Sequence, residues 1–209
     1  MIGRSETVVE ATPTADWTEL PGRLVVLSGA SGAGKSTIVR RLIEKLGGRV
    51  RQSISATTRA PRLGEIPGVS YQFVTPEEFE DLRGDLLESA EVHGAWYGTP
   101  AEPTRRALAE GTCVILVIDV QGGFQVRRKV PNALLIFVQA PSPATLEARL
   151  RARGTDDEAA IRRRLLNARL ENEMAADYDI HLVNEDLETC VDELAETLTR
   201  HHCWRDKRP

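Results

Sequence analysis

Eight consecutive residues offer the clearest chemistry in this sequence. The run Gly29-Ala30-Ser31-Gly32-Ala33-Gly34-Lys35-Ser36 matches the pattern G-x-x-x-x-G-K-[ST] in full. Glycines let the backbone curl so that successive N–H groups face a polyphosphate, and the N-terminus of the following helix adds its positive end. Lys35 supplies a point charge at the β- and γ-phosphates, and the Ser36 hydroxyl is placed to bind Mg²⁺. We expect a nucleoside triphosphate site here, to which Thr37 mainly contributes first-turn packing.

An alternative interpretation of this run is a glycine-rich turn with an exposed lysine. It is disfavoured because an apolar strand precedes the run and a helical segment follows it, as phosphate binding requires. The motif does not say what is done with the nucleotide. A GTPase, an ATPase motor and a small-molecule kinase all remain possible at this point.

Two arginines and two tyrosines predict a second anion site. Arg59 and Arg62 lie three residues apart in a turn-rich segment, where two planar guanidinium forks can point at one dianionic phosphate. Tyr71 and Tyr97 each offer a phenolic hydroxyl. Alone, Arg62 would be a solvated loop arginine, and either tyrosine would be a half-buried core residue. Four such residues in one segment favour a monophosphate site.

Arginines are also concentrated on two predicted helices nearer the C-terminus. Arg149 and Arg153 are four residues apart, and therefore lie on one helical face. Arg162, Arg163 and Arg164 follow on the next helix, where the first two are expected to solvate its surface. Phosphoryl transfer depends on positioning and charge stabilisation more than on covalent participation by the protein, so a mobile arginine lid would suit it.

The elements that must position these residues alternate between apolar strands and helices, which predicts an α/β fold with a largely parallel sheet. The expected core strands are Leu24 to Leu27, Cys113 to Ile118, Ala133 to Val138 and Asp179 to Val183. The expected helices are Ser36 to Leu46, Pro100 to Glu110, Pro143 to Ala152, Glu158 to Ala175 and Asp186 to His202, with a short helix beginning at Thr75-Pro76-Glu77-Glu78. Asp119 ends the second strand, at the sheet edge that faces a ligand crevice.

The organisation along the chain predicts one domain with two additions. Residues 1–20 lack an apolar period and are expected to be a disordered leader, although Trp17 can pack back. The domain is expected at 21–202, with a core of 21–50, 100–140 and 176–202, and 203–209 as a tail. Short strands and turn residues predict a small β-rich insertion at 51–99, and the arginine-rich helices predict a lid at 141–175.

Composition narrows the function classes. With 209 residues, 41% of them hydrophobic, the chain can bury one core, and its net charge of -4 argues against nucleic acid or an anionic membrane as a partner. The longest apolar run is too short to cross a bilayer. Three cysteines without metal-ligand spacing suit a reducing cytoplasm, as two core thiols and one tail thiol. His201, His202 and Cys203 are expected to form an exposed tail and not a metal cluster.

Several motifs, taken in order, resemble the guanylate kinase family from about Arg23 to His201. They are SATTRAPRLGE (Ser55 to Glu65), Tyr71, Glu88, WYGT (Trp96 to Thr99) and IDVQG (Ile118 to Gly122). The resemblance implies a P-loop NTPase-type parallel sheet core with helices on both faces, a GMP-binding insertion and a helical lid. It also implies the reaction ATP + GMP ⇌ ADP + GDP, with Mg²⁺ as cofactor and dGMP as a further acceptor.

The resemblance assigns the acceptor side to particular residues. Arg59, Arg62, Tyr71 and Tyr97 would bind the GMP phosphate, and Glu88 would bind guanine with help from Ser55 and Thr99. Guanine presents two neighbouring donors on one edge, so a carboxylate can accept both hydrogen bonds, whereas adenine does not offer that pair. The alternatives are that Glu88 is a surface strand residue and that Thr99 caps a helix. Thr99 could both cap the helix and contribute to recognition of the base.

The resemblance also assigns the donor side. Arg149, Arg153 and Arg164 would close over the transferring phosphoryl group, and Asn184 would contact the adenine of ATP. Asp119 would hold Mg²⁺ through water or contact the nucleoside monophosphate. Many family members have a second acid two residues earlier, where this chain has Val117.

Two other functions remain open from the sequence. Guanylate kinase-like domains also occur as protein-binding modules, typically with a degraded phosphate loop, whereas this chain keeps Lys35 and Ser36. A kinase for another phosphorylated small molecule is the second alternative, and Glu88 with the arginine-tyrosine cluster argues against it. The oligomeric state is left open.

Overall fold

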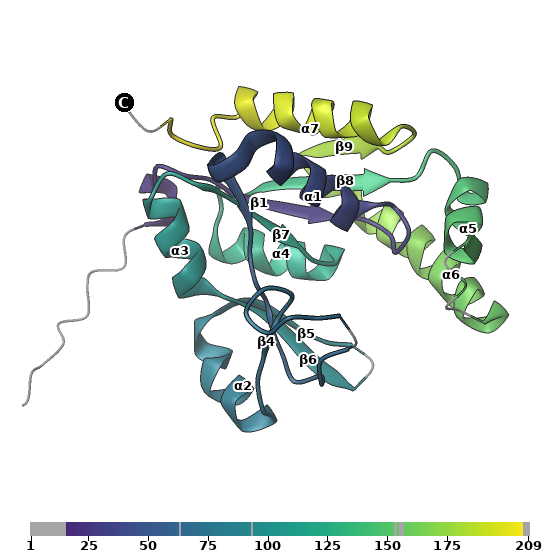
Figure 1. Cartoon of the computed structure of the whole chain (residues 1–209), viewed down its shortest axis with the longest axis horizontal. Helices are drawn as coiled ribbons and strands as arrows, with labels where there is room; N and C mark the ends of the chain where they lie inside the picture. The colour runs from purple at the N-terminus through teal and green to yellow at the C-terminus, as the bar shows by residue number, and fades with distance from the viewer. Residues whose placement is uncertain (1–15, 63, 93, 153, 155–156, 207–209) are drawn as a thin grey trace, which may run out of the picture.

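The computed structural model describes residues 16–62, 64–92, 94–152, 154 and 157–206 of the chain. Its larger sheet is parallel throughout, with the strand order β2-β7-β1-β8-β9 (Figure 1). The strands are β1 (Leu24–Ser28), β2 (Val50–Gln52), β7 (Cys113–Val117), β8 (Leu134–Gln139) and β9 (Ile180–Val183). The three central strands are almost entirely buried, because helices cover both of their faces.

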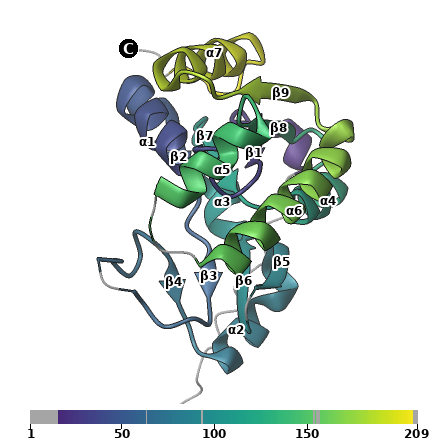
Figure 2. The ribbon, with the colours of Figure 1, turned by 90° about the vertical axis from the view of Figure 1, so that its right-hand side faces the viewer.

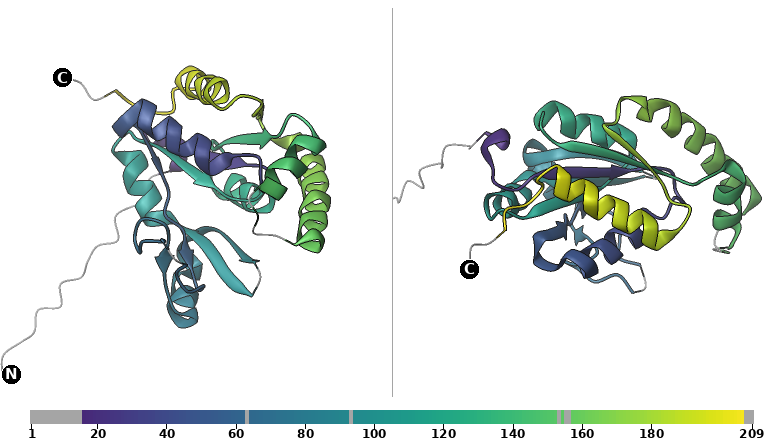
Figure 3. Two further views of the ribbon diagram at one scale, coloured as in Figure 1. Left: turned by 45° about the vertical axis from the view of Figure 1, so that its right-hand side comes forward. Right: turned by 90° about the horizontal axis from the view of Figure 1, so that it is seen from above.

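Two pairs of helices form these covering layers (Figures 1 and 3). The helices are α1 (Lys35–Leu46) and α7 (Leu187–Arg200) on one face, and α3 (Ala101–Ala109) and α4 (Val120–Lys129) on the other. Alternate strand residues serve the two layers: Val25 and Leu27 pack with α1 and α7, and Leu24 and Val26 pack with α3 and α4. The predicted α/β class with a parallel core sheet is confirmed.

The carboxyl ends of the core strands meet at one edge of the sheet. Leu27 of β1 is in register with Val117 of β7, and Gln139 of β8 is in register with Val183 of β9. The segments that follow these strands carry the phosphate loop, Asp119 and Asn184. The topology therefore gathers candidate residues from distant parts of the sequence, as expected for this class of sheet.

A second, four-stranded sheet projects from the core and lies below it in Figure 1, with the strand order β4-β3-β6-β5. Its elements are β3 (Ala56–Thr57), β4 (Gln72–Phe73), α2 (Pro76–Leu82), β5 (Leu86–Val92) and β6 (Ala95–Pro100). Thr75 and Glu78 form a capping box at α2, which confirms the predicted helix start. Phe79 and Leu86 form a small core of their own with Ala56.

Two further helices extend from the carboxyl edge of the sheet, α5 (Pro143–Ala152) and α6 (Glu158–Met174). They lie in front of the core in Figure 2, above the second sheet. Leu146 and Leu150 of α5 and Ala168 of α6 pack with Ala30 of the phosphate loop. The arginine-bearing helices are thus anchored directly on the candidate nucleotide site.

Helix α4 and strand β2 were not predicted from the sequence. Gly122 and Gly123 lie in the first turns of α4, where each glycine disfavours a helix by about 1 kcal/mol relative to alanine. The structure shows what Gly123 provides, because an added Cβ there would lie 2.0 Å from the hydroxyl of Tyr178. Tertiary packing therefore outweighs local propensity in this helix. Strand β2 has three residues and only Val50 of them is buried, so it leaves little apolar pattern to detect.

The last residues of the predicted leader are not disordered, and Trp17 packs back on the core as expected. Trp17–Glu19 form a short 3₁₀ helix capped by Asp16, and Trp17 and Leu20 pack against the core cluster that includes α3. The guanidinium of Arg105 lies 4.3 Å from the centre of the Trp17 ring. Residues 1–15, the remainder of the predicted leader, lie outside the described residues.

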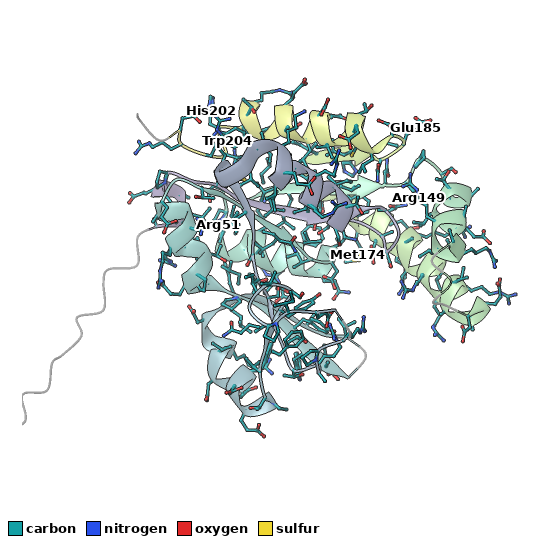
Figure 4. All side chains as sticks on the ribbon, viewed as in Figure 1. Arg51, Arg149, Met174, Glu185, His202 and Trp204 are labelled. Atoms are coloured by element: carbon teal, nitrogen blue, oxygen red, sulfur yellow. The ribbon has the colours of Figure 1, made fainter. Side chains whose placement is uncertain are left out.

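The predicted tail was also wrong at its start. Cys203 is fully buried and its carbonyl accepts a hydrogen bond from the Arg23 backbone at 2.9 Å, while Trp204 packs on the same core cluster (Figure 4). All three cysteines are free and buried, so the expected tail thiol is a core thiol.

In the part of the chain that the structure describes, no group of three or more His, Cys, Asp or Glu side chains could hold a metal ion by itself. Every helix in that part is too short or too polar to cross a membrane.

Candidate active site

The phosphate loop connects β1 to α1 and takes its shape from glycine. Gly29, Gly32 and Gly34 have φ values of 146°, 100° and 97°, which side chains with a Cβ rarely adopt. An added Cβ at Gly29 would lie 2.0 Å from the Val138 carbonyl oxygen. The Lys35 ammonium folds back and donates to the carbonyls of Gly29 and Ala30. The loop therefore curls around its own lysine at the start of α1.

Both residues that follow Lys35 are exposed. Ser36 is in the first turn of α1 with its side chain toward solvent, as the predicted metal-binding role requires. Thr37 is exposed too, which contradicts the expectation that it packs in the first turn. Buried helix positions begin only at Ile38 and Val39. The first turn thus presents two hydroxyls to solvent beside the loop.

Asn184 and Arg164 contact the loop from outside, and Arg149 contacts Asn184. The Asn184 side-chain amide donates to the Ala33 carbonyl at 2.7 Å, and an added Cβ at Gly34 would lie 2.3 Å from the same nitrogen. Arg149 on α5 (Figure 4) donates to the Asn184 carbonyl at 2.9 Å, and Arg164 on α6 donates to the Ser31 hydroxyl at 2.7 Å. Arg153 lies outside the described residues. Asn184 therefore links the loop to α5.

A cavity of about 450 Å³ opens between the phosphate loop and the second sheet. Its lining includes the loop, the segment after β7, the second sheet and α6, in the residues Gly29, Ser31, Lys35, Ser55, Tyr71, Glu88, Ala90, Val92, Tyr97, Val117, Ile118, Asp119 and Glu171. The structure thus brings the predicted lysine, the predicted acids and the predicted tyrosines around one space. Arg59, Arg62 and Thr99 do not line it directly.

Glu88 is the deeply buried acid of this cavity, with 5% of its surface exposed. Its Oε1 accepts a hydrogen bond from the Thr99 hydroxyl at 2.7 Å, and the Ser55 hydroxyl lies 3.3 Å from that of Thr99. Burial raises the pKa of Glu88 to about 7, with a smaller contribution from the negative charge of Asp119. The interpretation of Glu88 as a surface strand residue was wrong.

Thr99 is not a helix cap. The N-cap of α3 is Pro100, whereas Thr99 is fully buried and has its hydroxyl directed at Glu88. A buried hydroxyl needs a partner, and a carboxylate is a strong one. The local pattern resembling a capping box therefore misled the sequence interpretation at this position.

Arg59 is held by its neighbours in the second sheet. Its guanidinium donates twice to the Glu65 carboxylate, at 2.9 Å each, and once to the Tyr97 hydroxyl at 2.9 Å. The Arg59 pairing lowers the pKa of Glu65 to about 2. The Tyr71 ring lies 5.5 Å from the guanidinium and 5.8 Å from the Tyr97 ring. Arg62 differs, because its side chain is exposed and its backbone N–H donates to Glu65.

Asp119 begins α4 as its N-cap. Its Oδ1 accepts a hydrogen bond from the Gly122 backbone at 2.7 Å, and its carbonyl accepts one from the Ser28 hydroxyl at 3.1 Å. Ser28 in turn accepts a hydrogen bond from Tyr178, whose pKa burial raises to about 12. This buried network fixes Asp119 at the cavity edge, and Val117 lies two residues earlier in the same lining.

Two acids near the cavity, Glu65 and Glu171, were not predicted as site residues from the sequence. Glu65 was part of a quoted motif but had no role, although three residues after Arg62 is a spacing that allows it to close a turn. Glu171 had no local signal, because it is one of several acids on a polar helix. Its seven-residue separation from Arg164, two helical turns, is the one pattern from which its orientation could have been inferred.

The chain is similar to known proteins over most of its length. The family model for guanylate kinase matches residues 21–201. A guanylate kinase from Synechocystis sp. is 45% identical over 190 residues, which cover 88% of this chain and 96% of that protein. A guanylate kinase from Oleidesulfovibrio alaskensis is 50% identical over 175 residues, covering 83% of this chain and 84% of that protein.

The fold agrees with a solved structure. The crystal structure of guanylate kinase from Anaplasma phagocytophilum matches with a TM-score of 0.70 at 33% identity, covering 87% of this chain and 86% of that one. The chain is therefore similar to guanylate kinases both in sequence and in structure. This chain belongs to the guanylate kinase family.

Proposed function

We propose that this chain, an ATP:GMP phosphotransferase by its family, binds both substrates in the cavity between the phosphate loop and the second sheet. The observation that carries the assignment is the shared lining, in which Lys35 of the loop lies on the same space as Glu88, Tyr71 and Tyr97. One space lined by an ATP loop and an acceptor-binding acid allows direct in-line transfer between two bound nucleotides. The products are ADP and GDP.

On the donor side, the loop backbone binds the phosphates of ATP from Gly29 to Thr37. Lys35 contributes the positive charge at the β- and γ-phosphates, and must leave the carbonyls of Gly29 and Ala30 to do so. Asn184 contacts the adenine from the turn after β9. Its side-chain amide also fixes the loop at Ala33, so that it supports the phosphates as well as the base.

On the acceptor side, ionised Glu88 accepts the N1–H and 2-amino hydrogen bonds of guanine. Thr99 and Ser55 hold that carboxylate in place and complete recognition of the base. A buried carboxylate left unpaired by adenine gives strong discrimination. None of these contacts requires the ribose 2′-hydroxyl, so dGMP is an acceptor too.

The GMP phosphate binds to the arginine-tyrosine cluster. Tyr97 and Tyr71 line the cavity and donate their hydroxyls, while Arg59 supplies charge from behind Tyr97. Arg59 shares its fork with Glu65, so the phosphate competes with that carboxylate for it. Arg62, which is exposed, swings in to complete the pair of arginines.

The lid arginines and a metal ion provide the remaining charge. Arg149, Arg153 and Arg164 close over the transferring phosphoryl group and exclude water, which limits ATP hydrolysis. The donor set fits Mg²⁺, because Ser36 and Asp119 offer an exposed hydroxyl and an exposed carboxylate, the hard oxygen ligands that this ion prefers. When bound, Mg²⁺ neutralises charge on the β- and γ-phosphate oxygens.

The setting proposed for this reaction is the cytoplasm, with small nucleotides and no nucleic acid or membrane as partners. Three free thiols and a net charge of -4 support that proposal.

A coupled assay of ADP release tests the function directly. With ATP and Mg²⁺, turnover is expected with GMP and dGMP and at background level with AMP, CMP and UMP. Turnover with none of these acceptors, in protein shown to be folded by circular dichroism, would contradict the proposed reaction. Equal turnover with AMP would contradict the role given to Glu88 and leave the donor side intact.

A further inference from the structure

Glu171 is an acid of the cavity for which the proposed function gives no role. It lies on α6 and lines the space together with Lys35 and Asp119. Arg164 lies two helical turns earlier on the same helix, and so the same face of α6 brings a cation to Ser31 and an anion to the cavity. An anion is the unexpected member of that pair, since the site is proposed to bind two negatively charged nucleotides.

One oxygen of the Glu171 carboxylate has no hydrogen-bond partner among the described residues. This atom, Oε2, is also buried. A buried carboxylate oxygen without a partner costs about 1–3 kcal/mol or more. Burial also raises the pKa of Glu171, and the nearby charge of Asp119 raises it further while that of Lys35 lowers it. Such a carboxylate destabilises the folded protein unless a ligand supplies the missing hydrogen bond.

The charges around Glu171 restrict what that ligand can be. Triphosphate oxygens beside Glu171 and Asp119 would repel both acids at short range. A cation must therefore separate the acids from the phosphates. Lys35 is one such cation, but its ammonium already donates to the carbonyls of Gly29 and Ala30 and is needed at the phosphates. A divalent ion that keeps part of its water shell provides both the charge and the donors that an unsatisfied carboxylate accepts.

We propose that Glu171 is a positioning residue for Mg²⁺, accepting hydrogen bonds from the water shell of the ion that ATP brings to the loop. This inference rests on the proposed function. It assigns an acid of α6 to the same task as Asp119, which lines the cavity from the start of α4. Because Glu171 shares α6 with Arg164, the metal shell also holds the lid helix at the loop.

The main competing role for Glu171 is to orient Lys35 electrostatically. The two roles predict different dependence on the metal. A partner of Lys35 affects every form of ATP, because the lysine binds the phosphates with or without Mg²⁺. A ligand of the water shell affects only the magnesium complex.

The experiment is calorimetric titration of the full chain with ATP, once in Mg²⁺ and once in EDTA, without GMP so that no transfer occurs. Glu171→Gln removes the charge and keeps the shape. Its dissociation constant for the magnesium complex is expected to rise about tenfold, the lower end of the range for removal of an outer metal partner, while that for metal-free ATP stays within about twofold. Glu173→Gln, an exposed acid two residues further along α6, is the matched control and should change neither value.

The two dissociation constants distinguish the two possible roles of Glu171. An unchanged ratio of the two constants in Glu171→Gln overturns the metal role, and an equal loss in both buffers assigns Glu171 to Lys35 instead. Thermal denaturation without nucleotide should show no loss of stability in Glu171→Gln, since an unsatisfied charge has been removed. If that variant does not fold, Glu171→Asp retracts the carboxylate and should weaken only the magnesium complex. Absence of ATP binding by the parent chain would refute the proposed function itself.

Discussion

The phosphate loop and the acceptor side of the cavity are built in different ways. The loop is one continuous segment in which glycine conformations and backbone groups set the geometry, and Asn184 and Arg164 reinforce it from outside. The acceptor side is assembled from β5, β6 and the segment between β3 and β4, and depends on side-chain pairs such as Arg59 with Glu65 and Glu88 with Thr99. Backbone shape therefore defines the proposed donor site, whereas charge state and side-chain pairing define the proposed acceptor site.

The largest expected effect is on the donor side. Lys35→Ala removes the positive charge at the phosphates, and kcat should fall about a thousandfold, the upper end for loss of one transition-state donor. Steady-state assays with saturating GMP measure it. Lys45→Ala, on the same helix, removes only an exposed pair with Asp192 and should keep full turnover. A folded Lys35→Ala protein with unchanged kcat would contradict the donor site.

The acceptor side should respond next, and selectively. Glu88→Gln keeps the shape of the side chain but loses the charge that two guanine donors require, so kcat/KM for GMP should fall about a hundredfold. The KM for ATP should stay within about twofold of the parent value. Glu91→Gln, an exposed acid on the same strand, is the control. An equal loss for both substrates would show that the two sides are not separable as described.

The pH dependence of stability should also distinguish the two sides. Glu88 has a pKa of about 7 in the folded protein against 4.5 for the free group, so folding favours its protonated form. Its contribution to the free energy of unfolding is therefore complete below about pH 4.5 and is lost as the pH rises through 7.

Urea denaturation without nucleotide at pH 5 and pH 8 measures this effect. The parent should lose about 2 kcal/mol more than Glu88→Gln between these two values. The comparison with the variant cancels the titration of other groups. Identical pH profiles for the two proteins would mean that Glu88 is already ionised in the folded state.

The smallest effect is expected at the edge of the acceptor cluster. Tyr97→Phe removes the hydroxyl that accepts a hydrogen bond from Arg59 and faces the cavity. Loss of one hydrogen bond of about 1 kcal/mol should lower kcat/KM for GMP about fivefold. Competition assays against a fixed ATP concentration resolve a change of this size. A loss as large as that of Glu88→Gln would reverse the order of importance within the acceptor side.

The same contrast explains how much could be predicted from the sequence. The whole phosphate loop could be predicted because its residues are consecutive and its shape depends on its own backbone. The alternating apolar runs predicted the parallel core sheet. The loop-supporting contacts of Arg149 and Arg164 were not predictable from spacing, because they depend on where α5 and α6 pack.

The acceptor side was less predictable because its pairs are not local. The Glu65 carboxylate that holds Arg59 and the direction of the Thr99 hydroxyl follow from three-dimensional contacts. Helix α4 was missed for a related reason, since Gly123 looks unfavourable until the Tyr178 hydroxyl that it accommodates is known. Cys203 looked like a tail residue because the pattern after α7 gives no sign of its burial.

The distribution of tryptophans gives the molecule separate optical reporters. Of the three, Trp17 and Trp204 pack on the core, and Trp96 alone lies in the second sheet. The Trp96 ring contacts Phe79, with the Arg83 guanidinium 4.5 Å from its centre. With Trp17→Phe and Trp204→Phe, the tryptophan fluorescence of the chain would come from the second sheet alone. Because Trp96 is next to Tyr97, which lines the cavity, GMP bound at the proposed acceptor side is expected to change this emission more than ATP bound at the phosphate loop.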